Sequence, residues 1–381
     1  MSEFDRLVDR RNSFSTKWQK YKDRDVIPMW IADMDFKAPQ SVIAELSQRT
    51  QAGVYGYTDP PGELVEVLLH YLQSNFSWLV SEQDLVFIPG VIPGINIACR
   101  GLVNEGEAIL TATPTYPPFL SAPDNTGRDL IRVPAEEQDG SYVYPTKKLT
   151  EAITSNSRML LLCNPSNPIG RSLTRDELNG IVALCLEHNL LLCSDEIHCD
   201  LVFDGRAHIP VATINPAIED QLVTLIGPGK TYNLAGIGGA VAIIKNQALR
   251  EAFIVASAGI TGAVNLFSYP AMLAAYRDCS KWREELVAYL QGNRDYLLQR
   301  IAKMPNISIN DVEATYLAWI DVRGLGLADP QAFFEQAGVG LAAGEQYDGP
   351  GYLRLNFGCV RSVLAEACDR IESALRSTDT E

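Results

Sequence analysis

Short runs of consecutive hydrophobic residues alternate with amphipathic segments between about residues 60 and 250. Apolar runs of this kind are typical of strands that are buried on both faces of a parallel sheet. Four of them occupy residues 85–88, 159–163, 190–193 and 222–226. The segment that begins at Thr174 opens with a capping box, Thr174 to Glu177, and continues with helical spacing. The alternation predicts an α/β fold with a mostly parallel sheet and helices on both faces.

The pattern changes in the last third of the chain. We expect a long helical region at 267–302, a strand at 316–322, a helix at 330–337 and a strand at 352–357, followed by a last helix. A chain of 381 residues also exceeds one typical domain. We therefore expect a large domain at 46–265 and a smaller α+β domain at 266–381, which the N-terminal segment 1–45 joins.

Composition and charge narrow the class of partner. The net charge of −15 at pH 7 argues against nucleic acid and anionic membrane surfaces, so a small molecule is the expected partner. No apolar run has the length of a signal peptide core or a membrane span, and the eight cysteines show no disulfide framework, so we expect a cytoplasmic protein. The run His198-Cys199-Asp200 does not predict a metal site, because consecutive side chains do not converge on one centre.

Three candidate residues follow the ends of apolar runs. Asn167, Asp195 and Lys230 each come at or soon after such an end, and the carboxyl ends of parallel strands line the crevice in which open α/β sheets bind ligands. A lysine forms an imine with an aldehyde, a carboxylate keeps a heterocyclic nitrogen protonated, and an amide donates to a ring oxygen. Taken singly, each residue has an ordinary interpretation: Lys230 as a surface lysine, Asp195 as a carboxylate at the start of a helix, and Asn167 as part of a turn. Together they match pyridoxal phosphate.

A glycine turn adds a candidate phosphate site. The strand at 85–88 runs into Pro89-Gly90-Val91-Ile92-Pro93-Gly94 and then into a helical pattern. A glycine turn that opens a helix directs free main-chain N–H groups toward an anion. The motif is weak evidence by itself, because glycine and proline occur at many strand-to-helix turns.

The chain resembles a known family in nine motifs that occur in the same order. These motifs lie at 17–18, 28–36, 55–58, 89–93, 114–119, 163–168, 194–198, 230–236 and 353–356. The sequence resembles the fold-type I pyridoxal phosphate enzymes of the class I/II aminotransferase superfamily, and within it the MalY/PatB-type cystathionine β-lyases, or cysteine C–S lyases. The block around Trp30 and the residue His198, where aminotransferases tend to have tyrosine, favour the lyase branch.

The resemblance implies the cofactor contacts. Lys230 would bind the cofactor aldehyde and remove the α-proton of the substrate, Asp195 would pair with the pyridinium, and Asn167 would contact the ring oxygen, together with His198. The ring of Tyr116 would stack on the cofactor. The main-chain N–H groups of Gly90, Val91 and Ile92 would bind the phosphate, and Tyr57 would reach the phosphate of the other subunit of a homodimer.

The substrate contacts and the reaction follow from the same resemblance. Arg354 would bind the substrate carboxylate, with Ala32 and Asn167 beside it. The expected reaction is the α,β-elimination of cystathionine or related cysteine S-conjugates to pyruvate, ammonia and a thiol. Two alternatives are an aminotransferase of amino acids, which would use the same residues, and a cofactor-binding protein with a mainly regulatory role.

The chain departs from the family pattern around the lysine. Gly229 stands where serine usually precedes the lysine, Gly227 occupies another position where serine is common, and Gly238 stands where many aminotransferases carry an arginine. A hydroxyl that would bind the phosphate is therefore missing.

Overall fold

The computed structural model describes residues 2–138 and 140–378. The strands are β1 Ile27–Pro28, β2 Leu85–Ile88, β3 Ala108–Thr113, β4 Asp129–Pro134, β5 Glu136–Gln138, β6 Ser141–Val143, β7 Ser157–Cys163, β8 Leu191–Asp195, β9 Leu222–Ile226, β10 Ala240–Ile243, β11 Ser308–Ile309, β12 Leu317–Asp321, β13 Val339–Gly340, β14 Ala342–Ala343 and β15 Tyr352–Asn356. The helices are α1 Thr16–Gln19, α2 Gln40–Ala52, α3 Gly62–Phe76, α4 Val91–Leu102, α5 Pro117–Asn125, α6 Thr146–Ala152, α7 Arg175–Glu187, α8 Gln247–Ser257, α9 Ser268–Asp278, α10 Ser280–Ile301, α11 Pro330–Gln336 and α12 Arg361–Thr378.

A large, mostly parallel sheet has the strand order β2-β10-β9-β8-β7-β3-β4. Within it, β10 is antiparallel to both of its neighbours, and the strands from β9 to β4 run parallel. Side chains alternate between the two faces of a strand, so Met159 and Leu161 of β7 enter one core, while Leu160 and Leu162 enter another. This explains why the strand is apolar throughout.

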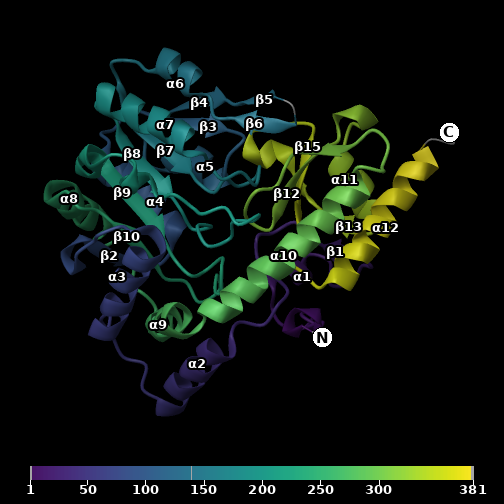
Figure 1. Cartoon of the computed structure of the whole chain (residues 1–381), viewed down its shortest axis with the longest axis horizontal. Coiled ribbons are helices and arrows are strands. Elements are labelled where there is room, and N and C mark those ends of the chain that lie inside the picture. The colour runs from purple at the N-terminus through teal and green to yellow at the C-terminus, as the bar shows by residue number, and fades with distance from the viewer. Residues whose placement is uncertain (1, 139, 379–381) are drawn as a thin grey trace.

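Helices cover both faces of this sheet, as Figure 1 shows. One core contains residues of α4, α5 and α8, and the other contains residues of α3, α6, α7 and α9. The predicted capping box is present at the start of α7, where Thr174 and Glu177 exchange hydrogen bonds. The expected α/β fold with helices on both faces is confirmed.

A second, four-stranded sheet has the order β11-β12-β15-β14, and it lies with α10, α11 and α12 beside the large sheet (Figure 1). The N-terminal segment pairs with this region, because β1 runs parallel to β13. These elements share a third core with Phe4 and Met34 from the N-terminal segment. The domain boundaries at 45 and 265 stay a prediction.

The helical region expected at 267–302 consists of two helices, α9 and α10, which meet at Cys279. The break has a packing reason. Helix α9 lies between two cores, because Met272 and Leu273 pack in a core of the large sheet and Ala274 packs in the third core. The buried hydrophobic residues of α10, such as Leu286, pack in the third core. The chain changes direction between these two cores.

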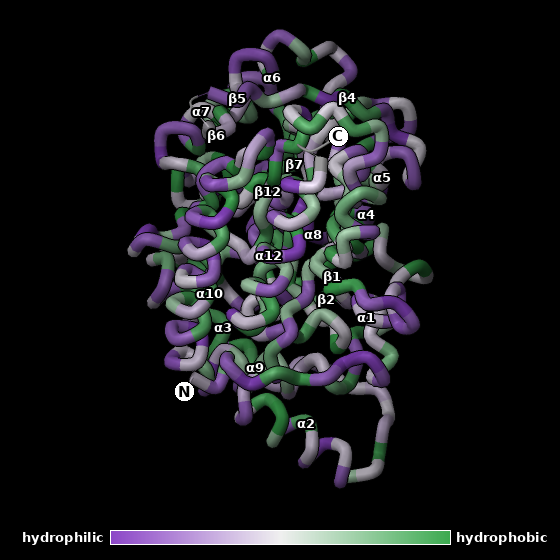
Figure 2. Tube along the Cα trace, turned by 90° about the vertical axis from the view of Figure 1, so that its right-hand side faces the viewer, coloured by the Kyte–Doolittle hydropathy of each residue, from purple (hydrophilic) through white to green (hydrophobic). Residues whose placement is uncertain are grey.

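Helix α2 projects from the bottom of the molecule in two perpendicular views (Figure 1, Figure 2). The segment that follows it, residues 53–61, has no regular structure and carries the exposed hydrophobic side chains of Val54, Tyr55 and Tyr57. Large exposed apolar side chains that lie close together mark an interaction surface. In residues 2–138 and 140–378, no helix is both long enough and apolar enough to cross a membrane.

Candidate active site

The strands β7, β8 and β9 are parallel neighbours, so their carboxyl ends lie at one edge of the large sheet. Asp195 is the last residue of β8 and lies opposite Cys163 of β7 and Leu225 of β9. Asn167 follows β7 by four residues, and Lys230 follows β9 by four residues. The structure thus brings these three predicted residues to one crevice, as the strand order requires.

Lys230 is half-buried in this crevice, and a main-chain oxygen holds its amine. Its Nζ donates to the carbonyl of Ala32 at 2.8 Å, and the hydroxyl of Tyr316 donates to the same carbonyl at 3.0 Å. Burial, with a further contribution from the nearby charge of Arg354, lowers the pKa of Lys230 to about 8. A larger fraction of the amine is therefore unprotonated near neutral pH than for an exposed lysine, as a nucleophile requires.

Asp195 is a buried carboxylate without a cation in contact. Its Oδ1 accepts from the main-chain N–H of Ile197 at 3.1 Å, and no Lys, Arg or His in residues 2–138 and 140–378 forms an ion pair with it. Burial raises its pKa to about 7. A carboxylate in such a place is suited to a ligand that brings its own N–H group.

The raised pKa of Asp195 predicts a pH dependence of the cofactor-free protein. Because the folded protein binds this proton more tightly than the unfolded chain, the free energy of unfolding falls as the pH rises from the usual pKa of 3.8 to about 7. Asp195→Asn removes this titration. The decrease in the free energy of unfolding between about pH 5 and about pH 8 should therefore be smaller in the variant by on the order of 3 kcal/mol. Urea denaturation of the wild-type and Asp195→Asn apoproteins at both pH values measures this difference. Equal losses in the two proteins would contradict the assignment.

Arg354 is a buried cation that forms no ion pair with a carboxylate in the described part of the chain. Its Nη1 donates to Oδ1 of Asn167 at 2.9 Å, and its Nη2 donates to the carbonyl of Trp30 at 2.7 Å. The guanidinium also lies over the ring of Tyr347, 4.7 Å from the ring centre. Its Nε has no hydrogen-bond partner among the described residues. Burial lowers the pKa of Arg354, and a ligand carboxylate would compensate the buried charge.

His198 and Tyr116 complete the walls of the crevice. His198 is buried, its Nδ1 has no hydrogen-bond partner in the part of the chain that the structure describes, and burial lowers its pKa well below the usual value. The imidazole is therefore neutral at pH 7. Tyr116 lines a cavity of about 180 Å³ together with Lys230, Gly90, Val91 and Ile92. Gly90 caps the N-terminus of α4, so the first N–H groups of that helix face this cavity.

Tyr57 does not line this cavity, and its side chain is fully exposed on the segment after α2. Within one chain, the structure therefore brings together all the predicted site residues except this one. Its contact with a second subunit stays a prediction.

Comparison with known proteins places the chain in a family. The model of aminotransferase class I and II matches residues 24–371. The chain belongs to this family. Among its relatives is cystathionine β-lyase PatB of Bacillus subtilis (strain 168), which is 33% identical over 98% of this chain and 99% of the relative.

Two solved structures extend the comparison. That of OvoB is 41% identical, with a TM-score of 0.96 over 98% of this chain and 99% of the other. That of cystalysin from Treponema denticola, which contains pyridoxal 5′-phosphate, is 31% identical, with a TM-score of 0.94 over 98% of this chain and 99% of the other. The chain has the aspartate aminotransferase-like fold of type I.

The residues present here fit pyridoxal phosphate. The cofactor has an aldehyde, a ring N–H and a phosphate. The crevice offers a half-buried amine at Lys230, a buried carboxylate at Asp195 that has no ion-pair partner in the described part of the chain, and a helix start at Gly90. The unpartnered Nδ1 of His198 and Nε of Arg354 are further polar atoms that a ligand would satisfy.

The sequence analysis did not predict the residues that contact Lys230 and Arg354 and hold them in place. Trp30 provides a carbonyl for Arg354, Tyr316 shares the Ala32 carbonyl with Lys230, and the ring of Tyr347 lies against Arg354. Trp30 lies in one of the family motifs, but nothing in that motif indicates that its carbonyl is the group used. Tyr316 and Tyr347 have no local signal.

An ion-pair network fixes the loop that carries Ala32. Lys17 is almost fully buried, and its Nζ lies 2.7 Å from Asp35 Oδ2 and donates to the Asp33 carbonyl at 3.2 Å. Arg10 binds both carboxylates at 2.8 Å. Because Asp33 directly follows Ala32, these contacts from the N-terminal segment help to position the carbonyl that holds Lys230.

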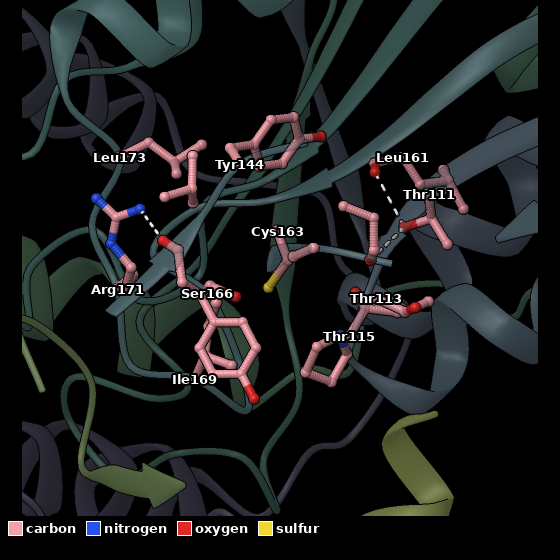
Figure 3. Close-up of a pocket in the computed structure, with 15 residues that line it drawn as sticks. Thr111, Thr113, Thr115, Tyr144, Leu161, Cys163, Ser166, Ile169, Arg171 and Leu173 are labelled. Carbon is pink, nitrogen blue, oxygen red and sulfur yellow. Dashed lines mark hydrogen bonds between the residues drawn. The ribbon is translucent and has the colours of Figure 1, made fainter. Parts of the chain in front are cut away.

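A small second cavity lies behind the loop that carries Asn167. It has a volume of about 30 Å³, which is enough for one water molecule, and the hydroxyl of Tyr144 on its wall has no partner among the described residues. Figure 3 shows the Cys163 side chain between Tyr144 and Ser166. The N–H of Asn167 lies 3.5 Å from the Cys163 sulfur. The residues around this cavity support the loop that carries Asn167, and the cavity is separate from the crevice.

Proposed function

We propose that the protein is a pyridoxal phosphate-dependent carbon–sulfur β-lyase that converts cystathionine or related cysteine S-conjugates to pyruvate, ammonia and a thiol. The observation that carries the proposal is the arrangement of three groups at one crevice: the half-buried amine of Lys230, the buried carboxylate of Asp195 and the buried guanidinium of Arg354. Neither Asp195 nor Arg354 has an ion-pair partner among the described residues. Relatives named as cystathionine β-lyases over almost the whole chain support the choice of reaction.

When bound, pyridoxal phosphate supplies an aldehyde for the substrate amine and a protonated ring that withdraws electrons from the α-carbon. Asp195 keeps the ring nitrogen protonated, because its buried carboxylate gains a hydrogen bond and a cation there. Neutral His198 and the amide of Asn167 would hold the ring oxygen, and Tyr116 would stack on the ring.

Arg354 and Lys230 act on the substrate itself. The guanidinium of Arg354 binds the α-carboxylate, and the Trp30 carbonyl and Asn167 fix its plane. Once released from the cofactor, the amine of Lys230 takes the α-proton. A sulfur substituent on the β-carbon then leaves as the thiol, with a proton from Lys230 or water, and the remaining fragment hydrolyses to pyruvate and ammonia.

We also propose that the enzyme is a cytoplasmic homodimer in which Tyr57 of one chain completes the phosphate site of the other. Support comes from the exposed Val54, Tyr55 and Tyr57, and from Ile92, which is exposed beside the phosphate cavity. All eight cysteines are free, which suits a reducing compartment. A monomeric mass of the cofactor-loaded protein in analytical ultracentrifugation would contradict the dimer.

Pyruvate release from L-cystathionine by the purified, cofactor-loaded protein, with no keto acid present, tests the reaction. Repeated turnovers are expected, because β-elimination regenerates the cofactor without a second substrate. Amino-acid turnover that depends on an added keto acid, without pyruvate release from cystathionine, would instead show an aminotransferase.

A further inference from the structure

The cavity between Lys230 and the start of α4 has few polar side chains. Of the described residues that line it, only Tyr116 and Lys230 carry a side-chain N–H or O–H group. The other lining residues are glycine, alanine, proline and branched aliphatic residues. In the proposed function, Lys230 binds the aldehyde and Tyr116 covers the ring, so neither remains for the phosphate.

We infer that each chain contributes only main-chain N–H groups to its own cofactor phosphate, besides the Tyr57 hydroxyl proposed to come from the second chain, and that the cofactor is held less tightly than it would be with a further side-chain hydroxyl at Gly229. The inference rests on the proposed function. The available donors are those of Gly90, Val91 and Ile92, while Pro93 at the next position has none. A helix start attracts a phosphate, but its partial charge is weaker than the charge of an arginine. No serine or threonine among the described lining residues adds a charge-assisted hydrogen bond.

The structure distinguishes among the three glycines that replace polar residues here. At Gly238, φ is +79° and a Cβ atom would lie 2.9 Å from the Pro89 carbonyl oxygen, so a side chain would be strained. At Gly227, a Cβ atom would lie 3.2 Å from the Cα of Ala240 and from the Gly239 carbonyl oxygen, which is crowded. Packing and backbone conformation therefore account for glycine at these two positions.

Gly229 is different. A Cβ atom there would lie 3.8 Å from the Cα of Ala235, an ordinary van der Waals distance, and its φ is not in the left-handed region. Gly229 also lines the cavity. A serine hydroxyl fits at this position, so nothing in the fold requires its absence. The chain holds its cofactor less tightly than its packing permits, and the loaded fraction of the enzyme follows the cofactor concentration.

The experiment compares Gly229→Ser with Gly229→Ala, which adds the same Cβ atom without the hydroxyl. Equilibrium dialysis of each apoprotein against pyridoxal phosphate gives the Kd directly, independent of activity. We expect Gly229→Ser to lower the Kd about tenfold or more, as for one added hydrogen bond to a charged group, and Gly229→Ala to match the wild type. Pyridoxal, which lacks the phosphate, should bind all three proteins equally.

Two outcomes would overturn the inference: an unchanged Kd for Gly229→Ser in protein with an unchanged melting temperature, or equal tightening by serine and alanine. Tightening of pyridoxal as well would show that the hydroxyl does not act on the phosphate. In each of these cases the wild type still releases pyruvate from cystathionine. If no variant binds pyridoxal phosphate, the proposed function itself is wrong, and the inference falls with it.

Discussion

Replacing Lys230 with alanine is expected to abolish pyruvate release, with a loss of at least about a thousandfold in kcat. Lys230 is the only amine in the described lining of the cofactor cavity, and its lowered pKa of about 8 makes it both a nucleophile and a base near neutral pH. The variant loses the covalent attachment of the cofactor and the group that takes the α-proton.

The measurement is steady-state pyruvate release, paired with the absorbance of the bound cofactor. Lys303→Ala is the matched control, since Lys303 is exposed on the surface and should leave both readings unchanged. Removing this half-buried amine should not lower the melting temperature of the apoprotein, so the melting temperature separates a loss of activity from unfolding. More than a tenth of wild-type activity in folded Lys230→Ala would refute its role.

The second large effect is expected for Arg354→Lys. Lysine keeps the charge but not the planar pair of N–H groups, so it cannot bind a carboxylate and also reach both Asn167 and the Trp30 carbonyl. We expect kcat/KM for cystathionine to fall by about a hundredfold, mainly through a higher KM, as for the loss of a charged hydrogen bond.

Arg323→Lys provides the control, because Arg323 is a largely exposed arginine that pairs with Asp321 on the surface. Its kinetics should match the wild type. Cofactor binding by Arg354→Lys should also be unchanged, because Arg354 is assigned to the substrate. A lower affinity for pyridoxal phosphate, or a fall in kcat with KM unchanged, would place Arg354 in another role.

Much of the fold was predictable because its signals are local. The strand expected at 85–88 is β2 with the same bounds, and the capping box at Thr174 opens α7 as expected. Both depend on residues that are close in sequence, so the spacing of hydrophobic residues and the capping side chains can be recognised from the sequence. The break at Cys279 was not predicted, because it depends on tertiary packing: α9 lies between two cores, and α10 packs in one of them.

The sequence by itself determined the chemical groups of the site and the strand ends that carry them: Asn167, Asp195 and Lys230 each follow a buried run that ends at one sheet edge. Tertiary structure decided how those groups are held and charged. The Ala32 carbonyl that binds Lys230 lies 198 positions away in the chain, and the Trp30 carbonyl that binds Arg354 lies 324 away. The lowered pKa of Lys230, the raised pKa of Asp195 and the open space at Gly229 likewise result from burial and close packing between distant segments, which no local pattern of residues encodes.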